Sequence, residues 1–374
     1  MPSALAFLPW VAIDEALTIG PLRLLPYQQG ELPGNLPNAT QVDIDRVLSA
    51  YSYRPKAKIK KATILELGEW QAGMEVQDTL QALFRARNAI AFAALSQRRL
   101  FRQHFDYCNY DTYGLVVQRY APGDARTFAF STRRRDGGTS HLWSSDEFSF
   151  HRPNHVDSNS RLSVDEPLLA TLLSISDSNS SLLEAMVEFN CANTDSPDVP
   201  DHVEVVMVKS AFEWLLGIGE KVNDFVEALK GCLNDTQPVS HREGPLDGPL
   251  KSRWSSARPK ATRPLEAWAM EFCDIRGASA HGVSRTAPRF VWPAHTQLAF
   301  ASLFFPLLFK KVVSRSGSFK LDDYDVERLR WIDAYLLHDP FAFDWTADEA
   351  THPWVEIDLS AMISAKVGNF YLEE

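Results

Sequence analysis

Apolar residues recur at helical spacing through the second half of the chain. Residues 201–217 predict a buried helix that begins at Asp201 as its cap and ends at Gly217. A second helix is predicted directly after it from one apolar stripe, formed by Val222, Phe225, Val226, Leu229 and Leu233. A third helix, predicted over residues 264–275, carries Leu265, Trp268, Ala269 and Phe272. Residues 321–332 predict a further, capped helix.

Strand patterns are typical of the first half. Apolar residues alternate or cluster over residues 16–25 and 59–67, and residues 113–120 with 127–132 predict a hairpin rich in aromatic and β-branched residues. One long helix interrupts these strands, over residues 76–101, with a broad apolar face. Much of its polar surface is supplied by Arg85, Arg87, Arg98, Arg99 and Arg102.

The two patterns together predict an α+β protein in two parts. A chain of 374 residues, 45% of them hydrophobic, is longer than one average domain needs and can form sizeable cores. The polar stretch at residues 151–161 marks the expected boundary. We expect an N-terminal mixed strand and helix domain over residues 1–158, followed by an all-α bundle with a C-terminal extension over residues 159–374.

Targeting signals and membrane spans are not expected from this sequence. The N-terminus lacks the basic region of a signal peptide, and the longest apolar run, over residues 298–313, is closed by Lys310 and Lys311 and is short for a bilayer. The cysteines have no paired spacing, which argues against a zinc site or a disulfide framework; they are Cys108, Cys191, Cys232 and Cys273. A reducing cytoplasm is therefore the expected location.

The strongest candidate for chemistry is the segment 271–282, where an apolar helix leads to an arginine, four small residues and a histidine. Arg276 supplies a planar cationic group that matches phosphate oxygens, and His281 can move protons near neutral pH. The small residues between them are expected to leave the backbone accessible to a ligand. The segment therefore predicts a phosphate site of the kind that RNA cleavage requires.

This order of helices, with the arginine and histidine near its end, resembles the HEPN superfamily, specifically the C-terminal HEPN domains of the ApeA-like antiphage proteins. The resemblance is carried by residues 210–216, by the approach from Trp268 to Phe272, and by residues 276–282. It covers roughly the second half of the chain. One departure is Gly277, because the family usually has a polar residue, often asparagine, directly after the arginine.

The resemblance implies a metal-independent endoribonuclease that acts as a homodimer, with an arginine and histidine pair from each copy facing the other. In this chain Arg276 and His281 would be catalytic, with Glu213, Gly277 and Asp274 in supporting positions. Glu213 is expected either on the polar stripe of its helix or held inward by a cation such as Arg276. A role in antiphage defence, as a toxic effector, is also implied.

The expected chemistry is transesterification, in which the ribose 2′-hydroxyl attacks the neighbouring phosphate and no cofactor takes part. His281 would act as general base or acid, and Arg276 would stabilise charge on the phosphoryl oxygens. The products would carry 2′,3′-cyclic phosphate and 5′-hydroxyl ends. The N-terminal half is expected to restrain or direct this activity in response to a trigger that the sequence does not identify.

The chain as a whole is acidic, with a net charge of −10, but some of its segments are locally basic. A stretch before the third helix is expected either to hold RNA or to form a solvated linker; its residues are Lys251, Arg253, Trp254, Arg258, Lys260 and Arg263. Two further basic clusters, at residues 56–61 and 133–135, are interpreted as solvent-facing strand and turn positions. No metal site is expected, because Pro153 interrupts the spacing of His151, His155 and Asp157.

Two alternatives to a nuclease stay open at this point. The first is a HEPN-like binding module for RNA or a protein, in which Gly277 marks lost catalysis. The second is a scaffold, in which Arg276 pairs with Asp274 or Glu271 and His281 caps the helix.

Overall fold

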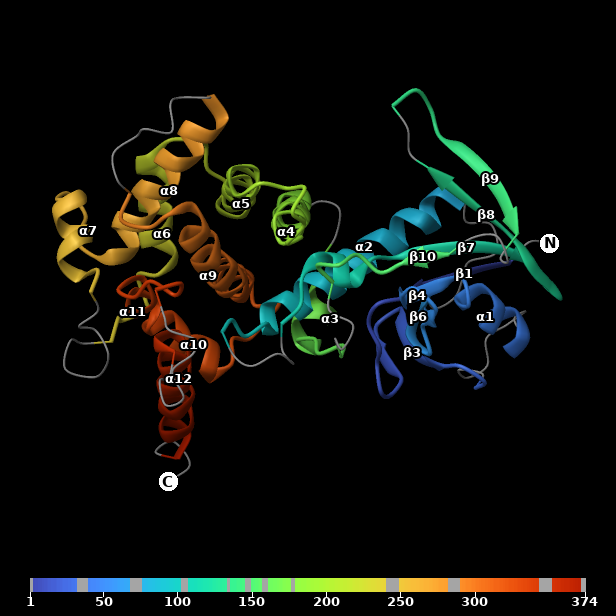
Figure 1. Cartoon of the computed structure of the whole chain (residues 1–374). Helices are drawn as coiled ribbons and strands as arrows, with labels where there is room; N and C mark the ends of the chain where they lie inside the picture. The colour runs from blue at the N-terminus through green and yellow to red at the C-terminus, as the bar shows by residue number, and fades with distance from the viewer. Residues whose placement is uncertain are drawn as a thin grey trace. The chain divides into compact units, whose positions relative to one another are not determined.

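The computed structural model describes most of the chain, in segments separated by short gaps. The described residues are 3–31, 40–67, 76–101, 107–132, 135–144, 149–156, 161–175, 179–239, 249–281, 290–342 and 352–370. Within them the fold is α+β, with a sheet region first and a largely helical part after it, as the sequence pattern predicts (Figure 1).

The chain forms two compact units. The first comprises Met1–Arg98 and His104–Ser174, and the second comprises Arg99–Gln103 and Ile175–Glu374. Residues 161–174, which lie beyond the boundary expected at residue 158, pack with the first unit because helix α3 (Glu166–Ser174) contacts the long helix α2 (Val76–Gln97). The short stretch at Arg99 joins the second unit, where Phe101 stacks on His352 at 4.4 Å.

A seven-stranded antiparallel sheet is the framework of the first unit. Its strand order is β2-β3-β6-β1-β7-β8-β9. The strands are β1 (Ser3–Leu8), β2 (Leu17–Ile19), β3 (Leu22–Gln28), β6 (Lys61–Leu67), β7 (Val116–Ala121), β8 (Asp124–Thr132) and β9 (Thr139–Ser144). The strands predicted at 16–25 and 59–67 and the hairpin at 113–132 are confirmed, whereas β1 was not predicted.

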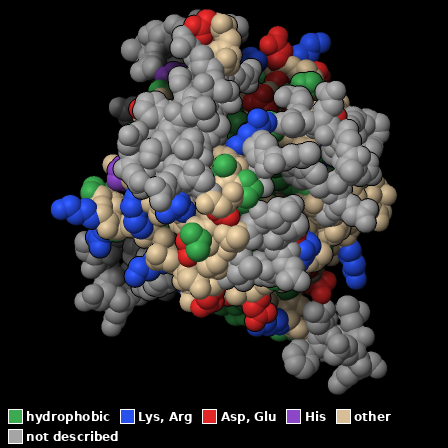
Figure 2. Space-filling view, turned by 90° about the vertical axis from the view of Figure 1, so that its right-hand side faces the viewer, with side chains coloured by type: hydrophobic (Ala, Val, Ile, Leu, Met, Phe, Trp, Pro, Cys, Tyr) green, Lys and Arg blue, Asp and Glu red, His purple; other side chains and the backbone are tan. Residues whose placement is uncertain are grey.

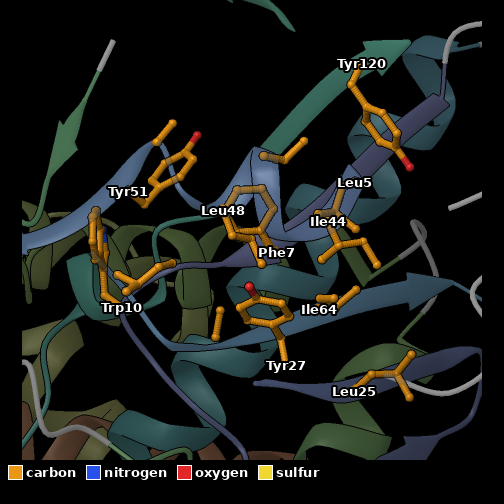
Figure 3. Packing of buried hydrophobic residues seen from close by; sticks show 14 of the residues in the cluster. Leu5, Phe7, Trp10, Leu25, Tyr27, Ile44, Leu48, Tyr51, Ile64 and Tyr120 are labelled. Atoms are coloured by element: carbon orange, nitrogen blue, oxygen red, sulfur yellow. The ribbon is translucent and has the colours of Figure 1, made fainter. Parts of the chain in front are cut away.

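A smaller sheet of three strands, in the order β10-β4-β5, packs on the core of this framework. Its strands are β4 (Tyr51–Arg54), β5 (Ala57–Lys58) and β10 (Phe150–His151). Tyr51 joins the two sheets, because its ring lies 5.1 Å from that of Phe7 on β1 (Figure 3). On the other side it stacks at 4.9 Å on Phe150 of β10. Burial of these aromatic rings away from water stabilises the packing of β4 on the core.

Helix α1 (Gln41–Leu48) closes this core with Ile44, Val47 and Leu48. Its first turn is held by a capping box, in which the Thr40 hydroxyl accepts a hydrogen bond from the backbone N–H of Asp43. Some arginines of α2 and the loop after it are structural rather than exposed. The Arg87 Nε donates to the carbonyl oxygen of Tyr113, the last residue of the 3₁₀ helix η1 (Tyr110–Tyr113), and Arg98 is buried.

The second unit is a helical bundle with an aromatic core (Figure 1). Its helices are α4 (Ser180–Cys191), α5 (Asp201–Leu216), α6 (Val222–Cys232), α7 (Lys251–Ala257), α8 (Pro264–His281), α9 (Ala294–Arg315), α10 (Asp323–Arg330), α11 (Ile332–Leu336) and α12 (Pro353–Phe370). Phe212 of α5 contacts the rings of Trp268 and Phe272 on α8 and of Phe305 on α9. These contacts fix α8 against its neighbours.

Helix ends agree with the predicted capping residues at several places. Gly217 ends α5 in the left-handed conformation, with φ of 63°, and Asp322 caps α10 by accepting from the N–H of Asp325. Asp201 is the first residue of α5, one position after the cap, which is Pro200.

Helix α9 is the longest apolar element of the bundle. By length and composition it is able to cross a membrane, and it extends beyond the run at residues 298–313, yet 72% of its most apolar window is buried inside the protein. Lys310, expected to close that run, is itself buried and pairs with Asp325 of α10 at 2.6 Å. Core helices of soluble proteins can have the same length and apolar composition, so these properties of α9 do not show whether the chain is associated with a membrane.

Candidate functional site

Helix α8 carries both residues of the predicted catalytic pair. It was expected to end at Ile275, but it continues for six more residues and His281 is its last. The extension follows from the residues themselves, because Ala278 and Ala280 favour a helix and neither Gly277 nor Ser279 is enough to end it. The backbone of the small residues is therefore committed to helical hydrogen bonds, rather than open to a ligand.

The helical path also separates Arg276 from His281 around the axis. Five residues of α-helix rotate the chain by about 140° past a full turn and advance it by about 7.5 Å. The two residues therefore start from different faces of α8. The side chain of His281 lies outside the described part of the structure, as does Gly282.

Arg276 is partly exposed and loosely held. Its Nη1 lies 3.5 Å from Oε2 of Glu220, in the loop after α5. The Glu220 side chain is 74% exposed, so solvent competes strongly for this pair. A pair of this kind constrains the arginine little, and an incoming phosphate can replace Glu220 as its partner.

Glu213 is held by a cation, but that cation is Lys209 and not Arg276. The Lys209 Nζ lies 2.8 Å from Oε1 of Glu213, one turn along α5, and 4.6 Å from the ring centre of Phe225. The lysine side chain is only 1% exposed, so its charge relies on these two partners.

The Cys273 thiol of α8 lies within the electrostatic reach of Lys209, Glu213 and Arg276. Burial raises the pKa of this thiol to about 11, and Lys209 opposes that rise. The thiol is therefore protonated at neutral pH and unsuited to act as a nucleophile. Cys273 lies where α5 packs against α8, close to the charges of Lys209, Glu213 and Arg276.

The other acidic residues of α8 have partners of their own. Asp274 pairs with Arg258 at 2.6 Å, and the buried Glu271 accepts hydrogen bonds from the Trp292 backbone at 2.8 Å and from Gln297 at 3.2 Å. Glu271 thereby anchors the start of α9. Neither carboxylate pairs with Arg276, so the scaffold interpretation is wrong about the partner of that arginine.

Gly277 has no packing reason to be a glycine. Apart from the backbone of its own helix, a Cβ added there would meet no atom of the described residues within 4 Å. Glycine inside a helix costs roughly 0.5–1 kcal/mol relative to alanine, and no contact here offsets that cost. The surface of α8 next to Arg276 is consequently open.

The basic stretch before α8 is neither a loop nor a linker over most of its length. It contains α7, on which Lys251 and Arg253 are exposed and Trp254 is half-buried. Arg258, directly after α7, is the partner of Asp274, and Lys260 is exposed.

Arg263 also has a structural role at the start of α8. Its Nε donates to Asp333 of α11 at 2.9 Å, and the same carboxylate accepts from the backbone N–H of Leu265. Burial raises the pKa of Asp333, and Arg263 opposes that rise. Of the six predicted RNA contacts, Arg258 and Arg263 are therefore engaged within the bundle, and the exposed cations are Lys251, Arg253 and Lys260.

Lys209 was not predicted as part of this region, and Glu271 was named only as a possible partner of Arg276. The sequence did contain a signal for Lys209, because it lies four residues before Glu213, the spacing at which opposite charges meet on a helix. Nothing in the sequence indicated the actual partners of Glu271, Trp292 and Gln297, which lie more than twenty residues away along the chain.

The histidines that were weighed as metal ligands are not gathered. His155 pairs with Asp111 at 2.6 Å and His151 is exposed, while Asp157 lies outside the described residues. No group of three or more histidine, cysteine or acidic side chains forms a metal-binding cluster among the residues that the structure describes.

Comparison with protein-family models, curated proteins and solved structures finds no significant match to this chain.

Proposed function

We propose that this chain is a metal-independent endoribonuclease of HEPN type, with Arg276 and His281 as its catalytic residues. The observation that carries the proposal is the state of Arg276. Its guanidinium is partly exposed, pairs among the described residues with one solvent-exposed carboxylate, and lies on α8 beside Gly277, where an added Cβ would meet no described atom within 4 Å. Most other charged groups of the neighbouring helices already have close partners.

The chemistry follows from the roles of the two side chains. Attack by a ribose 2′-hydroxyl on the adjacent phosphate needs a base for the hydroxyl proton, an acid for the leaving oxygen, and a cation for the phosphoryl charge. Arg276 supplies the cation, and His281 supplies one of the two proton-transfer groups. RNA cut in this way carries a 2′,3′-cyclic phosphate and a 5′-hydroxyl.

A homodimer completes the proposed site. One histidine does not sit on both sides of an in-line displacement, and the position of His281 on α8 is about 140° around the axis from that of Arg276. Two copies of α8 facing each other would place the arginine of one chain beside the histidine of the other. The first unit would then regulate this arrangement in response to a trigger, inside the cytoplasm.

The test is cleavage of a labelled single-stranded RNA by the purified full-length protein in excess chelator. Arg276→Ala and His281→Ala should each lower the rate by on the order of 100-fold or more, because each removes a transition-state interaction. Thermal unfolding and the oligomeric state should stay unchanged. Arg161→Ala and His202→Ala, which change the same residue types elsewhere, serve as matched controls and should cleave like the wild type.

The outcomes separate the alternatives. Wild-type cleavage by both α8 variants would contradict the catalytic roles. RNA binding without any cleavage by the wild-type protein would support the binding module instead, with Gly277 as the mark of lost catalysis. Cleavage that stops in chelator and returns with a divalent ion would show a different chemistry.

A further inference from the structure

The three-stranded sheet of the first unit presents the densest group of exposed cations in the described chain. Five of them lie in and directly after the hairpin β4-β5: Arg54, Lys56, Lys58, Lys60 and Lys61. We call these five residues the basic hairpin. Residues 46–65 contain no aspartate or glutamate, although the chain as a whole has a net charge of −10.

The cations of the basic hairpin are not used in folding. None of the five forms an ion pair with a described acidic residue, and all five are exposed. The contrast with Arg258 and Arg263, which both bind carboxylates, shows that this chain does neutralise cations where it needs them for structure. A row of unpaired like charges repels itself, so an anionic partner would stabilise it.

The strands hold these cations in place. Backbone hydrogen bonds join Ile59 N–H to the Tyr51 carbonyl at 3.1 Å, and Arg152 N–H to the Ser52 carbonyl at 2.9 Å. Tyr51 and Ile59 are buried in the core of the first unit. The hairpin is therefore a rigid support and not a tail that must be ordered when a partner binds.

Lys56 is a second, independent indication. Its φ of 66° places it in the left-handed region, where glycine is favoured and a lysine is strained. The strain is at the tip of the turn, where Lys56 is exposed to solvent. The chain therefore has a lysine at position 56, although the backbone conformation there favours glycine.

One aromatic side chain lies among the cations. Tyr53 is half-buried on β4, and its hydroxyl donates to the carbonyl oxygen of Lys61 at 3.4 Å. The Arg152 guanidinium is close enough to oppose the rise in the pKa of Tyr53 that burial causes. Arg152 has no side-chain hydrogen bond to any described residue, which adds a sixth cation beside the hairpin. A partly exposed tyrosine among cations suits a stacked base.

From this arrangement we infer that the basic hairpin, with Arg152 and Tyr53, is a binding surface for the backbone of single-stranded RNA. Figure 2 shows one face of the molecule, on which several lysine and arginine side chains are exposed. Four of the five hairpin cations are lysines, which bind phosphates as point charges and read no sequence. The inference goes beyond the proposed nuclease and does not depend on it.

Other anionic partners fit the hairpin less well. A membrane surface is bound by elements that also expose apolar side chains, and none of the exposed large apolar residues of the described chain lies between residues 51 and 61. An acidic protein would be bound best by arginine forks, whereas this surface is mainly lysine. Anionic vesicles and an acidic peptide therefore enter the test as rival probes.

The test is binding of the full-length protein to a labelled single-stranded RNA whose 2′-hydroxyls are methylated, so that transesterification does not interfere. Lys58→Ala/Lys60→Ala should weaken binding on the order of tenfold at 0.1 M salt and reduce the salt slope by about 1.4, or about 0.7 for each lost phosphate contact. The matched control is Lys320→Ala/Lys366→Ala, two exposed lysines of the second unit, which should bind like the wild type.

A second pair of measurements separates charge from folding. Lys58→Arg/Lys60→Arg should keep the RNA affinity, and all three double variants should unfold at the wild-type temperature. Unchanged RNA binding by Lys58→Ala/Lys60→Ala would overturn the inference. It would also be overturned if this variant lost binding to anionic phospholipid vesicles or to a polyglutamate peptide while RNA binding stayed the same.

Discussion

The interior of the second unit and the basic hairpin of the first use positive charge in opposite ways. In the second unit, Lys209 and Lys310 are buried, and each lies within 2.8 Å of a carboxylate oxygen. In the first unit, the five hairpin cations are exposed and form no ion pair with the described acids. Charge inside the bundle has been removed from water and depends on its partner, whereas charge on the hairpin keeps its hydration.

This difference separates structural charges from available ones. A buried ion must be paired, because the cost of removing it from water is several kcal/mol per ion. An exposed ion contributes little to the stability of the fold, so it can bind a ligand without loss of stability. Arg276 lies between these extremes, since it is partly buried and its partner among the described residues is the exposed Glu220. This intermediate state supports the catalytic role that we propose for Arg276.

The largest expected effect is on the buried side of the comparison. Asp325→Ala leaves Lys310 buried without the carboxylate that lies 2.6 Å from it, and should lower the free energy of unfolding by about 3–5 kcal/mol. Denaturant unfolding of the purified protein measures this loss.

The neighbouring residue of α9 supplies the control. Lys311 also pairs with an aspartate, Asp235, at 2.7 Å, but the Asp235 side chain is 56% exposed. Asp235→Ala should therefore cost less than about 1 kcal/mol. Equal losses in the two variants would show that burial does not separate these pairs.

An intermediate effect is expected from Glu204, a partly buried carboxylate on α5. Burial, with Asp195 and Asp201 as smaller causes, raises its pKa from 4.5 to about 7. The folded state then binds a proton that the unfolded state releases between pH 4.5 and 7, so this group makes the protein less stable as the pH rises through that range. At pH 8 Glu204→Gln should be about 1–2 kcal/mol more stable than the wild type.

The pH dependence provides the check on Glu204. The stability difference between Glu204→Gln and the wild type should shrink as the pH falls from 8 to 5, because the wild-type carboxyl becomes protonated. A difference that is independent of pH would mean that the glutamine acts through packing rather than through charge.

The smallest effect is expected at the tip of the basic hairpin. Lys56→Gly removes a side chain from a left-handed position and should raise the free energy of unfolding by about 0.5 kcal/mol, since glycine relieves the strain but adds freedom to the unfolded chain. Lys58→Gly, at a strand position two residues away, should instead destabilise the protein. Destabilisation of equal size by both changes would remove the evidence for strain at Lys56.

Prediction from the sequence worked where one local pattern decided the outcome. The stripe of Val222 to Leu233 and the capping aspartate Asp322 each involve residues close along the chain, and both helices are present. It failed at the end of α8, because the small residues after Arg276 are weak signals either for or against a helix, and the helix continues to His281. The strand β1 was missed because its partners, β6 and β7, are distant in sequence.

For the candidate site, the residue types were accessible from the sequence, whereas most of their partners were not. The pairing of Lys209 with Glu213 follows from their four-residue spacing on α5, whereas only the tertiary structure determines that Glu220, in the loop after α5, lies beside Arg276 of α8. The same holds for Arg258 and Arg263, which looked like equal members of a basic stretch and are in fact bound to Asp274 and Asp333.

By itself, the sequence determined the α+β class, the order of strands before helices, and the cations and histidine that are available for chemistry. Those properties depend on the periodicity of apolar residues and on side-chain identity, which are local. Only the tertiary structure decided which charges are buried and paired and which remain in water, as Lys310 and Lys56 illustrate. Burial depends on residues brought together from distant parts of the chain. Because a buried charge is costly without a partner, burial decides which charges must be paired within the fold.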